Sequence, residues 1–251
     1  MNRTSRVDAV TGMVLLLLPI LSILGFLVGI PLGELDPFSR SDLEEILETI
    51  HEHRELYALS LSAFVVQDVL VIPPTAALLY LAFRDRSHPL ALVFAFGMVA
   101  SAACFAVHEV GVLALAFLAE DFAVSGGPAG VGAGDPLILE AARTVSVIQG
   151  STALMGQTAI ALALTSLGLL LGWSPPGEKV PSRWLGCAAI GAGLCYLSTW
   201  TFFLSHTVGG IATLLGEVAI LLVMTVLGIW FLRAPGAVDE TVTPRHVAHP
   251  G

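Results

Sequence analysis

Residues 208–232 read VGGIATLLGEVAILLVMTVLGIWFL, an apolar stretch in which Glu217 is the one charged residue. A helix needs about 20 predominantly apolar residues to cross the roughly 30 Å hydrocarbon core of a bilayer. Because the stretch exceeds this length, it predicts a transmembrane helix. Its acid would lie inside the membrane, where an unpaired charge is costly and often marks a functional position.

Working outward, the sequence predicts five more spans by the same criterion. They are residues 10–32, 56–83, 89–118, 143–172 and 184–205. The least obvious is 56–83, since it contains Asp68 and the pair Pro73-Pro74. Its many Leu, Ile, Val and Phe residues favour insertion strongly enough to offset one central acid. We therefore expect an all-α, polytopic bundle of six transmembrane helices.

The composition supports the same class of protein. Of the 251 residues, 55% are hydrophobic and 12% are charged. Soluble domains carry about 25% charged residues, so this chain lacks the charge to cover a water-facing surface. Acids outnumber bases by 20 to 11, which leaves no basic patch for a nucleic acid. We expect the lipid bilayer as a partner, no nucleic acid and no cofactor, while protein partners stay open.

The basic residues predict the orientation. With the N-terminus inside, the cytoplasmic segments hold eight of the eleven lysines and arginines, as the positive-inside rule requires. We expect a multi-pass protein of the plasma membrane with both termini in the cytoplasm. Residues 1–9 would form a cytoplasmic N-terminus, 10–232 the transmembrane domain and 233–251 a disordered cytoplasmic tail.

An acidic segment at residues 34–55 follows the first span and lies on the predicted outer side. Within it Leu43, Ile46, Leu47 and Ile50 recur at helical spacing, while acids fill the positions between them. This alternation predicts a short amphipathic helix on the outer surface or over the mouth of the bundle.

Polar side chains recur inside the predicted spans at similar depths. The ionisable ones are Asp68, His108, Glu109 and Glu217, and the amides Gln149 and Gln157 accompany them. At 1.5 Å of rise per residue, Asp68, His108 and Glu217 lie roughly 13–18 Å from the outer boundary. Such groups normally face the interior of a bundle. We therefore predict a polar layer near the middle of the membrane, formed by several helices.

Small and polar residues along two spans support this layer. In the third span they form the stripe Gly97, Ser101, Cys104, His108 and Gly111. The fourth span carries a similar stripe, Ser146, Gly150, Ala153, Gln157 and Ala161. Small residues let membrane helices approach closely, so these stripes predict the faces turned into the bundle. His108 would then point inward, and Glu109, about 100° further round the helix, would face a different neighbour.

Two functions are compatible with such a layer. It could bind or move a proton, a cation or a small polar solute, or it could be a structural network in a membrane scaffold or partner subunit. No named motif of catalysis or metal binding occurs. His108-Glu109, for example, is followed by Val112 where the second histidine of a His-Glu-x-x-His zinc site would stand. Enzymatic activity is the less favoured interpretation, with no catalytic residue assigned.

Parts of the chain resemble a bacterial family of six-helix membrane proteins known only as a domain of unknown function. The resemblance rests on Pro181-Ser-Arg-Trp-Leu-Gly186, Gly193-Leu-Cys-Tyr196, Gly216-Glu217 and Gly228-Ile-Trp230 in the C-terminal half. A second similar segment runs from His53-Arg54 through Asp68 to Pro73. The resemblance implies six helices and a glutamate in the last one, and it implies no activity.

Overall fold

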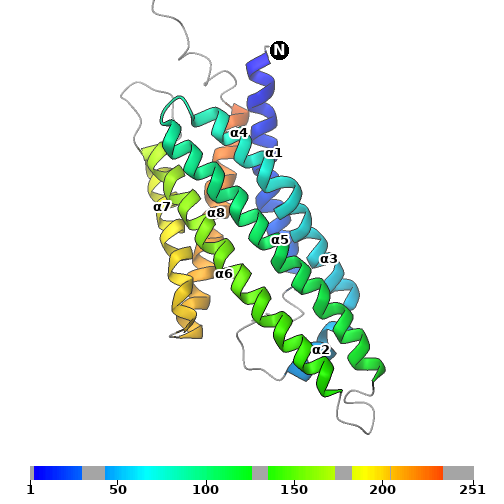
Figure 1. The fold of residues 1–251 in the computed structure, drawn as a ribbon. Helices are drawn as coiled ribbons and strands as arrows, with labels where there is room; N and C mark the ends of the chain where they lie inside the picture. The colour runs from blue at the N-terminus through cyan, green and yellow to red at the C-terminus, as the bar shows by residue number, and fades with distance from the viewer. Residues whose placement is uncertain (1–2, 30–42, 126–134, 173–182, 204, 234–251) are drawn as a thin grey trace, which may run out of the picture.

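The computed structural model describes residues 3–29, 43–125, 135–172, 183–203 and 205–233 (Figure 1). In this part of the chain every regular element is helical, which confirms the all-α prediction. In chain order the elements are α1 (Arg3–Gly29), α2 (Leu43–Glu52), α3 (Arg54–Val65), the π-helical turn η2 (Val66–Val71), α4 (Ile72–Phe83), α5 (His88–Val124), α6 (Pro136–Gly172), α7 (Arg183–Ser198), the 3-10 turn η3 (Thr199–Phe203) and α8 (His206–Arg233).

Five helical segments are long and apolar enough to cross a bilayer. They are Val7–Val28, Arg54–Phe83, His88–Val124, Pro136–Gly172 and Thr207–Arg233. The second of these joins α3, η2 and α4 into one continuous rod. The chain is a multi-pass membrane protein whose outer faces associate with lipid.

The remaining predicted span, 184–205, forms a shorter helix. Its α-helical part, α7, has 16 residues, and η3 adds five residues in the tighter 3-10 geometry. Together α7 and η3 rise about 34 Å, which matches the roughly 30 Å of hydrocarbon. By contrast, α5 and α6 have 37 residues each and extend past the ends of α7 and α8 toward α2 (Figure 1).

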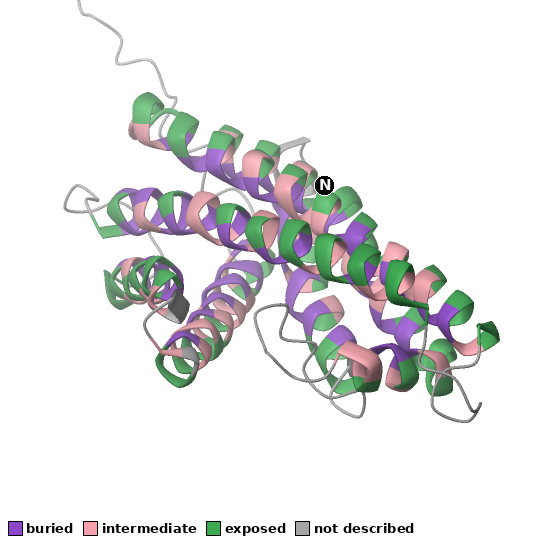
Figure 2. Cartoon of the chain, turned by 60° about the horizontal axis from the view of Figure 1, so that its bottom comes forward, coloured by how far each residue is buried: buried purple, intermediate pink, exposed green. Residues whose placement is uncertain are grey.

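The five long segments and the shorter α7 pack as a ring in chain order. α1 contacts α3, α4 contacts α5, and the contacts continue through α6, α7 and α8 back to α1. The buried stripe of each helix turns toward its neighbours and the exposed stripe turns outward (Figure 2). Large apolar side chains on the outward stripes, such as Leu70, Phe96 and Phe117, are mostly exposed, as expected for surfaces that meet lipid.

Glycines set the closest approaches between helices. A Cβ on Gly97 of α5 would lie 2.8 Å from the carbonyl oxygen of Ala159 in α6, and one on Gly111 would lie 3.2 Å from the Cβ of Gln149. The predicted small-residue stripe of α5 is therefore the face that packs on α6. In the same way α6 and α7 meet at Gly168 and Gly186.

Two apolar clusters divide the interior. The larger, here called the core cluster, fills the bundle on the side of the N-terminus and includes Leu15, Phe83, Phe94, Leu164 and Phe231. The smaller, here called the cap cluster, lies on the side of α2. Its buried members are Leu47, Ile50, Tyr57, Leu115, Ala119, Phe122 and Ala142.

The amphipathic helix predicted after the first span is α2. Leu47 and Ile50 are buried in the cap cluster, so the helix packs against the ends of α5 and α6. The preceding residues 34–42 and the predicted tail beyond Arg233 lie outside the described residues.

Candidate functional site

Asp68 lies in η2, where the helix widens. The Ile72 amide donates to the carbonyl oxygen of Gln67, five residues back, instead of to that of Asp68. Pro73 and Pro74 have no N–H. The carbonyl group of Val69 therefore finds no amide donor at the fourth or at the fifth residue ahead of it. This loss of donors accounts for the π-helical turn, a distortion that occurs often at functional sites.

The turn directs Asp68 inward. Its side chain is buried, while the next two residues, Val69 and Leu70, are exposed toward lipid. The Gln67 amide donates to Asp68 Oδ1 at 3.4 Å, and Ser22 of α1 donates to Gln67 Oε1 at 2.7 Å. The carboxyl group is therefore held by a short polar chain that also ties α1 to η2.

Glu217 of α8 pairs with Tyr196 of α7. The buried Tyr196 side chain lies within electrostatic range of the Glu217 carboxylate. Gly216 permits this approach, since a Cβ there would lie 3.3 Å from two carbons of the Tyr196 ring. The Tyr196 ring itself is part of the core cluster. This tyrosine thus joins the polar interior to the apolar interior.

Glu109 of α5 is buried on the face opposite α6. Its charge acts on Tyr57 of α3, whose hydroxyl donates to the Val112 carbonyl oxygen at 3.0 Å. Tyr57 belongs to the cap cluster. Glu109 is also within electrostatic range of Asp68, and Asp68 is within range of Glu217.

These neighbours form a series, here called the acid column. In the order Tyr57, Glu109, Asp68, Glu217 and Tyr196, each member lies within electrostatic range of the next. They come from four different helical segments, and they connect the cap cluster at one end with the core cluster at the other. Within the described residues, no lysine or arginine forms an ion pair with any of the three carboxylates.

The other predicted members of the layer lie on a different face. His108 turns toward α6, with Nδ1 3.0 Å from the Gln149 carbonyl oxygen. Gln149 is buried, and its Oε1, like that of Gln157, has no hydrogen-bond partner. Where the chain is described, His108 has no contact with the carboxylates, so the polar groups form two sets separated by the body of α5.

Sequence reasoning missed four residues that support the site: Tyr57, Tyr196, Ser22 and Gln67. The two tyrosines lie within apolar runs and carry no charge, so a search for ionisable residues passes over them. Gln67 directly precedes Asp68 within a predicted span. A polar residue beside an intramembrane acid could have indicated that Gln67 belongs to the site.

The Tyr57 hydrogen bond carries a testable contribution to stability. Tyr57→Phe removes the donor to Val112, and a typical bond of this kind contributes about 1 kcal/mol. We expect the unfolding temperature in detergent to fall by about 2–4 °C. Tyr80→Phe is the matched control, because its hydroxyl is exposed and lies 3.3 Å from His88 Nδ1. Equal effects of the two changes would contradict the proposed role of the buried bond.

Comparison with known proteins places the chain in a family. No curated protein and no solved structure matches it. A family model nevertheless confirms the resemblance to a domain of unknown function, which was inferred from the segments around Asp68 and Glu217. The model of the family described as "Domain of unknown function (DUF4386)" matches residues 10–234, most of the chain, and the chain belongs to this family.

Proposed function

We propose that the protein moves protons across the membrane through the acid column, taking them up from the side on which α2 lies. The observation that carries the proposal is that the buried Asp68 lies within electrostatic range of two further carboxylates from other spans, Glu109 and Glu217. Several negative charges in a medium of low polarity are strongly unfavourable unless positive charge compensates them. Protons or cations supply that charge.

Protons fit the arrangement better than metal ions. Among the residues that the structure describes, no group of three or more His, Cys, Asp and Glu side chains is placed to hold a metal. A proton needs one carboxylate at a time and can pass between neighbours through hydroxyl groups or water. Tyr57 and Tyr196 offer such hydroxyl groups at the two ends of the column.

The surroundings of the column support a direction of entry. At Tyr196 the column meets the core cluster, the larger apolar region, on the side of the N-terminus. On the other side the cap cluster is smaller and is covered by the short helix α2. By the positive-inside rule the N-terminal side is cytoplasmic, in the plasma membrane, so the protons would enter from outside.

A flux measurement in vesicles tests the proposal. The protein is reconstituted into liposomes with an imposed pH gradient and an internal pH-sensitive dye. We expect proton flux above that of protein-free vesicles, and a loss on the order of tenfold or more in Glu109→Gln and in Glu217→Gln. Glu120→Gln is the matched control. It lies on the same helix as Glu109, but it is exposed and pairs with Arg54 at 3.5 Å.

A second function is favoured by the extent of the apolar core cluster, which lies between the acid column and the N-terminal side of the bundle. In this alternative the protein is a scaffold or partner subunit, and the acid column is a structural network. Wild-type protein would then carry no flux, and the glutamine variants would unfold at lower temperature. If a gradient of sodium or potassium ions, rather than a pH gradient, changes the signal of the dye, the acid column binds that cation and the proposal of proton movement is wrong.

A further inference from the structure

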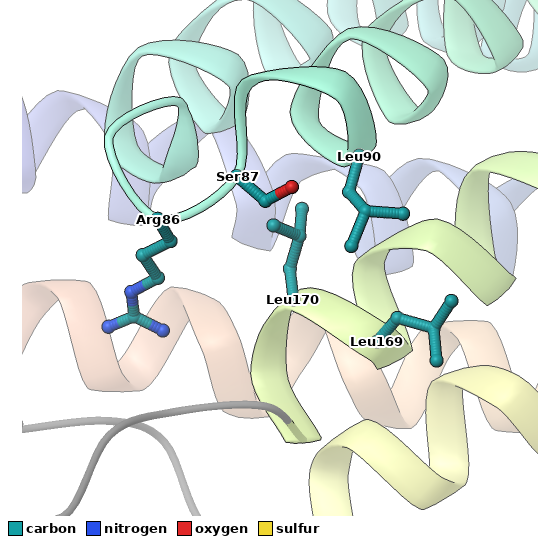
Figure 3. A pocket seen from close by; sticks show the side chains of 5 residues that line it. All are labelled: Arg86, Ser87, Leu90, Leu169 and Leu170. Carbon is teal, nitrogen blue, oxygen red and sulfur yellow. The ribbon is translucent and has the colours of Figure 1, made fainter.

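The two ends of the bundle differ in the groups that could exchange protons with water. On the N-terminal side a cavity of about 300 Å³ lies between the turn that joins α4 to α5 and the end of α6 (Figure 3). Its described lining residues include no carboxylate and no histidine; they are Arg86, Ser87, Leu90, Leu169 and Leu170. At the other end α2 covers the cap cluster, and α2 contains a histidine, His51.

His51 lies on the face of α2 that packs on the bundle. Leu47 and Ile50, which are 0% and 1% exposed, point into the cap cluster. Because His51 follows Leu47 by four residues, it shares the same stripe of the helix. The acids Glu48 and Glu52 lie on the exposed face. The His51 ring is therefore turned toward the bundle, unlike these two acids.

The His51 ring meets both the surface and the interior. The residue is partly exposed, but its Nδ1 is buried and has no hydrogen-bond partner among the residues that the structure describes. A buried polar atom without a partner is unfavourable, and a functional role is one explanation for such an atom. Histidine gains and loses a proton near neutral pH, and its two ring nitrogens can have different partners. One nitrogen of such a ring can take up a proton from water while the other releases one inward.

The residues beneath α2 lead to the acid column. Tyr57 belongs to the cap cluster that α2 covers, and its hydroxyl donates to the Val112 carbonyl oxygen at 3.0 Å. Glu109 lies within electrostatic range of Tyr57. Leu115, also of the cap cluster, is six residues beyond Glu109 on α5, which is about 9 Å along the helix. A proton released beneath α2 can therefore reach Glu109 through water or the Tyr57 hydroxyl.

We propose that His51 is the residue through which protons enter the acid column, an inference that rests on the proposed function. A proton from water on the α2 side binds to Nε2 and gives the imidazolium form. The proton on Nδ1 is then released toward Tyr57 and Glu109, which leaves a neutral ring that carries its proton on Nε2. A flip of the ring, or exchange of that proton with water, restores the first form.

The vesicle assay of proton flux tests this role with two histidines of one segment. We expect His51→Gln to lower the flux by about tenfold or more, because a positioned group that transfers protons contributes at least this much. His53→Gln is the matched control, since His53 lies two residues further on and is exposed. Its flux should equal that of the wild type. Equal flux in the two variants would overturn the inference.

Chemical rescue separates proton transfer from a role in packing. His51→Ala removes the ring, and free histidine, a zwitterion that does not cross the bilayer, is added outside the vesicles with glycine as the comparison. We expect histidine to raise the flux of His51→Ala several-fold, glycine to have no effect, and His53→Ala to respond to neither. This rescue decides the matter if His51→Gln does not fold.

The outcomes distinguish this inference from the function on which it rests. If the wild type carries flux but histidine restores none in His51→Ala, His51 is not the entry residue, and the acid column is reached by another route. If the wild type carries no flux, the proposed function is wrong, and the role of His51 is wrong with it.

Discussion

Replacing Gly168 by leucine is expected to destabilise the protein by about 3 kcal/mol, because overpacking of a tight contact costs about this much. A Cβ at Gly168 would lie 2.6 Å from the carbonyl oxygen of Gly186 and 2.5 Å from Cγ1 of Ile190. A backbone oxygen cannot move aside without shifting α7 as a whole. At 2–4 °C per kcal/mol for a chain of this size, the unfolding temperature should fall by about 10 °C.

The control for Gly168→Leu is Gly191→Leu on α7. No atom of a neighbouring helix lies within 4 Å of the position that a Cβ on Gly191 would occupy, so the new side chain points outward. We expect a change within about 0.5 kcal/mol, as for other surface substitutions. Thermal unfolding of the two variants in the same detergent compares them. A fall of similar size in both would mean that α6 and α7 do not meet at Gly168.

Asp68→Asn is expected to abolish proton uptake and, unlike Gly168→Leu, to stabilise the fold. The substitution keeps the shape of the side chain and the acceptor oxygen for the Gln67 amide. It removes one acidic group that faces Glu109 and Glu217 in a buried position. Functional sites are commonly strained in this way, so replacing their charged residues commonly stabilises the protein. We expect the free energy of unfolding to rise by about 1 kcal/mol and the proton flux to fall to that of protein-free vesicles.

The sign of the change in stability separates the two candidate functions. A structural network would lose a needed partner in Asp68→Asn, and the unfolding temperature would fall. Glu140→Gln serves as a control, since Glu140 is exposed and lies 3.4 Å from Arg143. Surface pairs of this kind contribute little, so its unfolding temperature should hardly change. Loss of stability in Asp68→Asn together with unchanged flux would contradict the proposed function.

Hydropathy located the spans well but not their full lengths. The third span was predicted at 89–118, whereas α5 continues to Val124, past Glu120 and Asp121. The fourth was predicted to begin at residue 143, and α6 begins at Pro136. A helix does not end where hydrocarbon ends, and charged residues extend both helices into the region beside α2. The amphipathic pattern was sufficient to predict α2, because one face of that helix is buried and the other is not.

The site was harder to predict, because depth in the membrane does not fix which face a residue occupies. Asp68, Glu109 and Glu217 were named from the sequence, and in the structure Asp68 lies within electrostatic range of the other two. His108 was expected near them, but it turns toward α6. A shift of one residue rotates a side chain by about 100°, which separates His108 from Glu109. The π-helical turn at Asp68 changes this rotation again, and regular helical spacing does not anticipate it.

Cross-linking between α8 and η2 tests most directly whether the carboxylates of different spans face one another. The native cysteines, Cys104, Cys187 and Cys195, are first replaced by alanine. Asp68→Cys and Glu217→Cys are then combined and treated with a short bifunctional thiol reagent, and intramolecular cross-linking is measured by mass spectrometry. We expect efficient cross-linking of this pair and none for Leu70→Cys with Glu217→Cys, since Leu70 is exposed on the outer face. The reverse pattern would contradict the acid column.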